Sequence, residues 1–239
     1  MAEHSGSLTR LPDDASEHGV VVAPESGADA DHPMRKVTRQ VAFEHGWSAG
    51  RARKVADLFD GMAAEWDAPR SGLVRTAPIR DALARGGMRL DGRWLELGAG
   101  TGVGTRIIAP ALAAAGGSVV AVDLALRMLR ESPARVAPLV HGDASSLPFA
   151  DGVFHGVAMF NMLLFPEEVD RVVAADVGQL LWINSSGDRT PIHLSPEDFL
   201  AALPGPGRGP CAGQGGWSGV WARSGSGFWV VASRGLPVA

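Results

Sequence analysis

A carboxylate followed by regularly spaced glycines occupies residues 96–104 of this 239-residue chain, in the order Glu-Leu-Gly-Ala-Gly-Thr-Gly-Val-Gly. The glycines are Gly98, Gly100, Gly102 and Gly104. Glycine adopts positive φ at no steric cost and lets the backbone come close to a ligand. Because the apolar residues Trp94 and Leu95 precede the motif, it indicates a strand that turns sharply over a small molecule. A tight strand-to-helix turn without a ligand is the alternative interpretation.

Two aspartates follow the next two apolar runs of the chain. Asp123 ends the run 118–122, and Asp143 comes shortly after the run 137–140. A carboxylate after the second strand can accept hydrogen bonds from ribose hydroxyls, and one after the third can accept from the amino group of a nucleobase. Taken singly, an aspartate such as Asp123 is more often a turn or helix-cap residue, and Asp143 is equally explained by an Asx turn.

The glycine spacing does not match the dinucleotide fingerprint, which needs glycines at the first, third and sixth positions. Counting from Gly98, the sixth position is Val103, and counting from Gly100 it is Thr105. This mismatch disfavours an NAD(P)-dependent oxidoreductase, which stays as an alternative function.

Apolar runs alternate with helical patterns, which predicts a parallel sheet with helices on both faces. The strands of this part are expected at residues 93–97, 118–122, 137–140, 153–160 and 178–184, and the helices at 102–115, 124–130 and 166–175. Two later runs, 217–223 and 227–233, are joined by Ser-Gly-Ser and predict an antiparallel hairpin. The expected fold class is therefore α/β, a Rossmann-like seven-stranded, mostly parallel sheet.

Helical periodicity precedes the first strand. Between Arg35 and Trp66, the residues Val55, Phe59 and Met62 recur on one helix face together with Trp66. A second helix is expected over residues 76–85. Residues 34–88 are therefore predicted to form N-terminal helices that cap the active end of a domain spanning residues 34–239.

The composition limits the other possibilities. Residues 1–33 carry seven acidic side chains and one basic one, with little apolar periodicity, and are expected to form a disordered tail. The remainder is close to neutral, so we expect no nucleic-acid partner. The single cysteine, Cys211, excludes an internal disulfide. The longest apolar run, 107–122, contains Pro110 and is too short to span a bilayer. We therefore expect a cytoplasmic protein without a membrane partner.

Several of these features together resemble one enzyme family. The acidic glycine motif, Asp123, the segment 142–149 and the cap motif at residues 59–67 are similar to those of class I S-adenosylmethionine-dependent methyltransferases, in the methyltransferase type 11-like branch that acts on small molecules. The resemblance covers about residues 55–200. It implies S-adenosylmethionine as the cofactor and a small-molecule methyl acceptor as the partner.

The resemblance also implies which residues hold the cofactor. The matching positions are Glu96, Gly98, Gly100, Gly102, Asp123, Leu124, Asp143, Ala144 and Asn161. The loop glycines would lie beneath the methionine part, and Glu96 would hold its ammonium group. Asp123 would bind the ribose hydroxyls, and Asp143 the adenine amino group, with Leu124 against the ring. Asn161 would line the methyl-donor end.

The sequence assigns no catalytic base, because methyl transfer from a sulfonium depends chiefly on alignment and the exclusion of water. His193 is the candidate general base, and a surface-loop histidine is the alternative interpretation. No metal site is expected. A second function class keeps the fold but not the turnover, as a cofactor-binding regulatory protein. The oligomeric state is left open.

Overall fold

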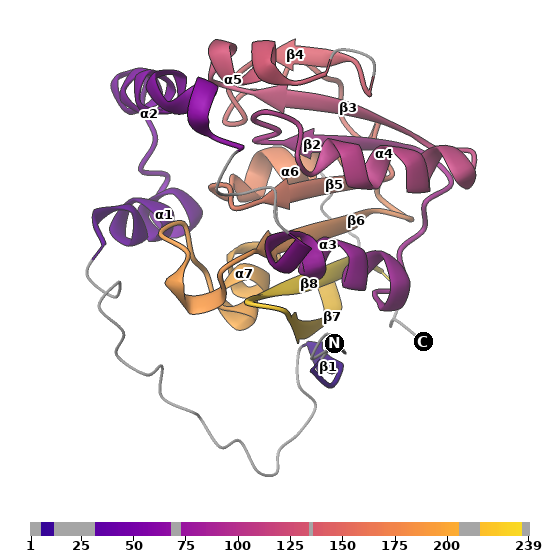
Figure 1. Ribbon diagram of the computed structural model, residues 1–239. Coiled ribbons are helices and arrows are strands. Elements are labelled where there is room, and N and C mark those ends of the chain that lie inside the picture. Colours follow the sequence, from indigo (N-terminus) through magenta and orange to yellow (C-terminus); the bar gives the residue numbers. More distant parts are fainter. Residues whose placement is uncertain (1–5, 12–31, 68–72, 134–135, 206–215, 236–239) are drawn as a thin grey trace.

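Five apolar runs form the parallel part of a single sheet (Figure 1). The computed structural model describes residues 6–11, 32–67, 73–133, 136–205 and 216–235. The parallel strands are β2 (Arg93–Leu97), β3 (Ser118–Asp123), β4 (Leu139–His141), β5 (Gly156–Phe160) and β6 (Gln179–Asn184). Strands covered on both faces have few polar positions, which is why they appear in the sequence as nearly continuous apolar runs.

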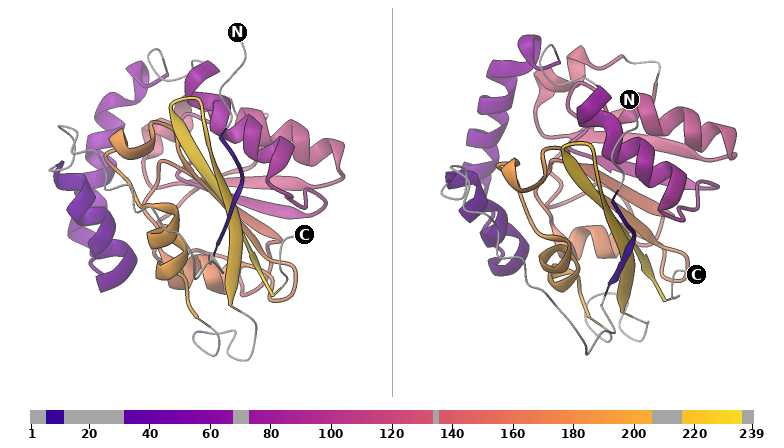
Figure 2. Two further views of the ribbon diagram at one scale, coloured as in Figure 1. Left: turned by 90° about the horizontal axis from the view of Figure 1, so that it is seen from below. Right: turned by 60° about the horizontal axis from the view of Figure 1, so that its bottom comes forward.

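The sheet has eight strands rather than the seven that the sequence predicts, in the order β1-β7-β8-β6-β5-β2-β3-β4. The predicted hairpin is confirmed as β7 (Trp217–Ser224) and β8 (Gly227–Arg234), with β8 antiparallel to β6. The additional strand is β1 (Thr9–Leu11), which pairs antiparallel with the outer edge of β7 (Figure 2). The tail prediction is thus wrong for residues 9–11, because the otherwise unpaired edge of β7 gives this short segment backbone partners.

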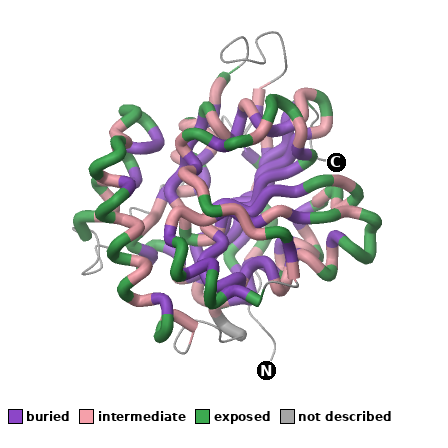
Figure 3. Tube along the Cα trace, turned by 90° about the horizontal axis from the view of Figure 1, so that it is seen from above, coloured by how far each residue is buried: buried purple, intermediate pink, exposed green. Residues whose placement is uncertain are grey.

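Alternate side chains of each strand enter two different cores. On β2, Leu95 and Leu97 join a core that includes residues of α1 (Pro33–Glu44), α6 (Pro166–Val172) and α7 (Pro196–Ala202). Trp94 faces the opposite way, into a core with α3 (Leu73–Arg85) and α4 (Thr105–Ala114). This is the two-residue period of a strand buried on both faces. Figure 3 accordingly shows buried residues concentrated along the sheet.

The N-terminal cap consists of two helices where the sequence indicated one continuous helical segment. They are α1 and α2 (Ala49–Met62), followed by the 3-10 turn η1 (Ala63–Glu65). The break occurs because His45 adopts the left-handed conformation at φ 52°, and Ser48 then caps the start of α2. Figure 1 shows α1 and α2 beside the strand ends rather than on a sheet face.

The remaining helix of the parallel part is α5 (Leu126–Glu131), which follows β3, and a short turn η2 (Gly187–Arg189) follows β6. α7 was not predicted from the sequence. None of the helices within the described ranges combines the length and apolarity needed to cross a membrane.

Candidate functional site

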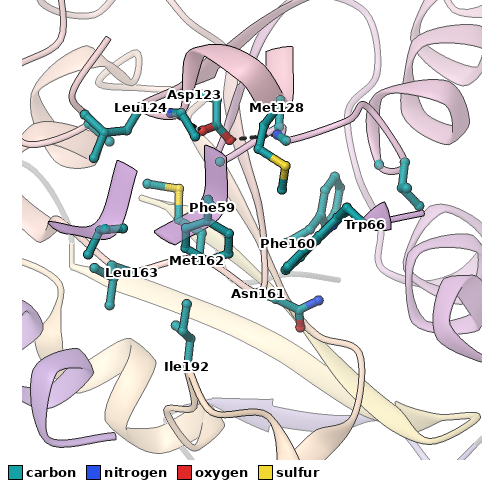
Figure 4. Close-up of a pocket in the computed structure, with 18 of the residues that line it drawn as sticks. Phe59, Trp66, Asp123, Leu124, Met128, Phe160, Asn161, Met162, Leu163 and Ile192 are labelled. Carbon is teal, nitrogen blue, oxygen red and sulfur yellow. Dashed lines mark hydrogen bonds between the residues drawn. The ribbon is translucent and has the colours of Figure 1, made fainter. Parts of the chain in front are cut away.

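A cavity of about 570 Å³ opens where the parallel strands end (Figure 4). Its walls come from the segments after β2, β3, β4, β5 and β6, and from the cap helix α2. The carboxyl ends of parallel strands meet at one edge of the sheet, which brings together residues that are distant in sequence. The predicted cofactor residues that line the cavity are Glu96, Gly98, Gly100, Asp123, Leu124, Asp143, Ala144 and Asn161.

The loop after β2 has the backbone shape that its glycines allow. Gly98 has φ 68°, and a Cβ there would lie 2.7 Å from the Sδ atom of Met162. At Gly104 a Cβ would lie 2.1 Å from the ring of Phe160, which is closer than real atoms approach. Gly102, which is predicted to bind the cofactor, is not among the described residues that line the cavity. Its φ is 80°, and a Cβ there would meet Ser132 at the end of α5. Its requirement for glycine therefore comes from the packing of the loop.

Glu96 is a fully buried carboxylate at the base of this loop. One oxygen, Oε2, accepts a hydrogen bond of 2.5 Å from the Thr105 hydroxyl, whereas Oε1 has no hydrogen-bond partner among the described residues. Burial raises the pKa of Glu96 to about 8; the Asp123 charge adds to this, and the bond from Thr105 opposes it. An unpartnered buried carboxylate oxygen is costly, and a cationic donor would satisfy it.

Asp123 ties the end of β3 to the glycine loop. Its Oδ2 accepts from the backbone N–H of Gly100 at 2.7 Å, and its Oδ1 from that of Ala125 at 2.7 Å. Figure 4 shows this carboxylate at the rim of the cavity, with Leu124 beside it. Burial raises the pKa of Asp123, while the two backbone bonds oppose the shift. Since a carboxylate has about four acceptor positions, both oxygens retain capacity for further donors.

Asp143 lies in the turn after β4 and is held by two donors. The Ser145 backbone N–H donates to Oδ1 at 2.8 Å. The indole Nε1–H of Trp47 lies 2.9 Å from Oδ2 and 3.1 Å from Oδ1. Trp47 belongs to the turn between α1 and α2, 96 residues away in sequence. The neighbouring Ala144 is buried and lines the cavity.

Asn161 follows β5 and adopts the left-handed conformation with φ 50°. Its side chain makes two hydrogen bonds to Ser185 after β6: Nδ2 donates to the hydroxyl at 2.9 Å, and Oδ1 accepts from the backbone N–H at 2.8 Å. Asparagine tolerates this conformation better than most residues. The residue therefore fixes the ends of β5 and β6 at the cavity wall.

The cap is anchored directly on the glycine loop. Asp67, just after η1, accepts a hydrogen bond from the Thr101 hydroxyl and forms a 3.0 Å ion pair with Arg106 of α4. Phe59 and Trp66 meet edge to face at 5.4 Å and cover the same end of the cavity (Figure 4). The cap motif at residues 59–67 thus contacts the glycine loop through Asp67.

His193 is not part of the described cavity lining. Its Nδ1 lies 3.0 Å from Oδ1 of the buried Asn184, and its ring stands edge to face on Phe228 at 5.7 Å. Burial lowers the pKa of His193. The loop after β6 turns this side chain back into the protein, which is the geometry of a structural histidine. Cys211 lies outside the described residues. Within the described ranges, no group of three or more His, Cys, Asp or Glu is placed to hold a metal ion.

The comparisons with known proteins agree with this geometry. Residues 95–181 match the methyltransferase domain family. The matched segment, which is less than half of the chain, is similar to the class I S-adenosylmethionine-dependent methyltransferases. A curated relative, the demethylmenaquinone methyltransferase of Mycolicibacterium vanbaalenii, is 39% identical over 113 residues, which are 44% of this chain and 46% of that protein. The chain thus matches less than half the length of this relative.

Two solved methyltransferase structures share the fold over more of the chain. A S-adenosylmethionine-dependent methyltransferase from Aquifex aeolicus has a TM-score of 0.51 and 17% identity, covering 74% of this chain and 98% of its own. A Thermotoga maritima methyltransferase, described as a possible histamine N-methyltransferase, has the same TM-score and identity, covering 76% and 99%. At this identity the likeness establishes the fold alone.

The contacts of two cavity residues, Glu96 and Asp123, fit S-adenosylmethionine as a ligand. Oε1 of Glu96 is buried without a donor from the part of the chain that the structure describes, and an ammonium group is a donor that would satisfy it. Asp123 retains acceptor capacity at the rim, as hydroxyl donors would require. Both groups are acidic, which suits a cationic ligand and would repel the phosphates of a dinucleotide.

Sequence reasoning missed three features of the site. It did not identify Trp47 as a partner of Asp143, the contact between Gly98 and Met162, or the clamp from Asn161 to Ser185. The unusual number of tryptophans in the chain, seven with no tyrosine, was the one available signal for Trp47. The other two contacts join separate strand ends and leave no local pattern.

Proposed function

We propose that this chain transfers the methyl group of S-adenosylmethionine to a small apolar acceptor. The observation that carries the proposal is the buried Glu96 carboxylate, whose Oε1 has no described partner and lies beside a loop of positive-φ glycines. Few small molecules carry a cation to such a position together with hydroxyl groups for Asp123. S-adenosylmethionine carries both.

The roles of the carboxylates follow from their places on the sheet. Glu96 lies near the end of β2, Asp123 is the last residue of β3, and Asp143 follows β4; these three strands are neighbours in that order. The cofactor would therefore extend along this edge, with its methionine part at Glu96 and its adenine at Asp143. When bound, it supplies an electrophilic methyl group on a sulfonium that leaves as a neutral thioether.

The acceptor would occupy the other half of the cavity, toward β5 and β6. The apolar residues of that wall and of the cap include Val55, Leu58, Phe59, Met62, Trp66, Phe160, Met162 and Ile192. Polar lining residues there include Asn161, Ser185 and Arg75, whose Nη2 donates to Ser186 at 3.1 Å. An apolar body with a small polar group fits this wall better than a charged one, because the wall would leave charges poorly solvated.

The name of the curated relative suggests one such acceptor, demethylmenaquinone, which would have to be in its reduced, nucleophilic form. The chain's contribution would be to align the nucleophilic atom of the acceptor with the methyl group and to exclude water. The acceptor forms a bond to the methyl carbon as the carbon–sulfur bond breaks, and its proton passes to solvent. A base is needed only where that proton must leave early.

Calorimetry with S-adenosylmethionine and S-adenosylhomocysteine tests the cofactor first. Labelled methyl donor then tests transfer to a reduced demethylmenaquinone analogue with a short chain, with histamine as the polar comparison acceptor. We expect cofactor binding and label in the quinol product. If the folded protein binds neither cofactor form at millimolar concentration, the proposal fails. Binding without transfer to any acceptor would favour a regulatory protein, and binding of NAD(P) alone would favour an oxidoreductase.

A further inference from the structure

The turn between α1 and α2 places an indole N–H on the carboxylate of the candidate adenine site. Trp47 donates to Oδ2 of Asp143 at 2.9 Å, and its ring stands edge to face on Phe165 at a centroid distance of 5.3 Å. All three side chains line the cavity. Trp47 is half-buried, so this contact joins the cap to the nucleobase end of the site.

The turn that carries Trp47 is held by its own hydrogen bonds. Arg51 donates to the backbone oxygen of Gly46 and, through Nη2, to the side chain of Gln40 at 2.8 Å. The Gly46 N–H donates to the Gln40 backbone oxygen at 2.9 Å, and Ser48 caps α2. A Cβ at Gly46 would lie 2.9 Å from Gln40. These contacts fix the position from which the indole reaches Asp143.

We propose that Trp47 is a positioning residue that makes the site select an amino-substituted purine over an oxo-substituted one. The proposal rests on the proposed function, because it concerns the adenine end of the same cofactor site. Trp47 acts through Asp143 by holding the carboxylate in one orientation with an acceptor position left open toward the cavity.

The selectivity follows from the chemistry of the carboxylate. An ionised aspartate can only accept hydrogen bonds. The 6-amino group of adenine is a donor and would be accepted, whereas the 6-oxo group of hypoxanthine is an acceptor and would face Asp143 unpaired. The Ser145 N–H occupies Oδ1, which leaves Oδ2 with room for a second donor.

The test compares two ligands that differ only at this group, S-adenosylhomocysteine and S-inosylhomocysteine. Trp47→Phe keeps an aromatic ring against Phe165 but removes the N–H. The matched control is Trp221→Phe, because the Trp221 indole nitrogen has no hydrogen-bond partner among the described residues and lies outside the cavity lining. Dissociation constants are measured by calorimetry on full-length protein whose folding has been checked by its melting temperature.

We expect the wild type and Trp221→Phe to prefer the adenosine ligand, and Trp47→Phe to reduce that preference by roughly tenfold, the loss typical of one hydrogen bond to a charged group. Equal weakening of both ligands, unchanged binding, or tighter adenosine binding in Trp47→Phe would overturn the proposal. If Trp47→Phe does not fold, benzothienylalanine at position 47 preserves the shape without the N–H, and the same outcomes decide. Failure of the wild type to bind either ligand would instead refute the cofactor assignment.

Discussion

The raised pKa of Glu96 leads us to expect that cofactor binding releases a proton at neutral pH. Its pKa is raised to about 8 chiefly because the side chain is fully buried. The carboxyl group of the ligand-free protein is therefore mostly protonated at pH 7. An ammonium group against Oε1 favours the ionised form, so binding must remove the proton. Glu96→Gln has nearly the same shape and no proton to lose, which makes it the matched control.

The size of the effect follows from the pKa. A group with a pKa of about 8 is about nine-tenths protonated at pH 7, so binding should release about 0.9 proton. Ionising it at pH 7 lowers the affinity roughly tenfold. Relative to Glu96→Gln, the affinity for S-adenosylmethionine should rise by about 50-fold from pH 6 to pH 8 and level off above pH 8. The affinity rises with pH because a larger fraction of Glu96 is ionised at higher pH, and the ionised form is the one that pairs with the ammonium group.

The same shift affects the stability of the ligand-free protein. Because the folded pKa of Glu96 exceeds its ordinary value of 4.5, the folded state holds the proton more tightly than the unfolded state. Its contribution to the free energy of unfolding should be fully present below about pH 4.5 and decline as pH rises to about 8. Urea unfolding of Glu96→Gln should lack this decline.

Calorimetry in buffers of different ionisation enthalpy measures the released protons directly. The cofactor's own amino group also titrates near neutral pH, but its contribution is common to the wild type and Glu96→Gln and cancels in their difference. We expect that difference to be close to one proton at pH 7. Equal proton release by the two proteins, or a wild-type affinity that is flat between pH 6 and pH 8, would refute the reasoning.

Three further substitutions test other parts of the structure. Asp123→Ala should weaken S-adenosylmethionine binding by about 1–3 kcal/mol in calorimetry, and an unchanged affinity would remove this residue from the ribose site. Gly104→Ala should lower cofactor affinity by at least roughly tenfold, a 1.4 kcal/mol loss, because its Cβ would lie 2.1 Å from the Phe160 ring. Its control, Gly61→Ala in α2, meets nothing within 4 Å and should raise the melting temperature slightly without changing affinity; equal effects of the two alanines would contradict the packing argument. Asp170 and Arg234 form a buried ion pair. Asp170→Asn removes the negative charge from this pair and should lower the free energy of unfolding by about 3–5 kcal/mol in urea titration. A loss below about 1 kcal/mol would show that the pair contributes little.

The sequence predicted the succession of strands and helices along the chain well, because the parallel strands are buried on both faces. Such strands leave apolar runs that need no knowledge of their partners. Their bounds were less accurate: the predicted strand 153–160 begins only at Gly156, since Phe154 makes an isolated bridge to Val173 before the ladder starts. Strand ends depend on where neighbouring strands run out, which a single segment does not record.

Features that depend on distant partners could not be predicted. β1 has three residues in a polar segment, and its pairing requires the edge of β7 some two hundred residues later. His193 comes after β6 in the order expected for a cavity residue, yet Asn184 and Phe228 hold it on the protein side of the loop. The order of residues along the chain identified the loop in which His193 lies, but not the direction of its side chain.

The cap reaches both ends of the cofactor site, and this links its position to ligand binding. At the glycine loop, Asp67 pairs with Thr101 and Arg106, and at the nucleobase end Trp47 donates to Asp143. The cap cannot leave the sheet without breaking contacts at both ends. A ligand that needs Asp143 and the loop in these positions therefore stabilises the docked cap, and the docked cap favours the ligand by the same free energy. Since α2 also supplies apolar wall on the acceptor side, cofactor binding would shape the acceptor cavity before the acceptor enters.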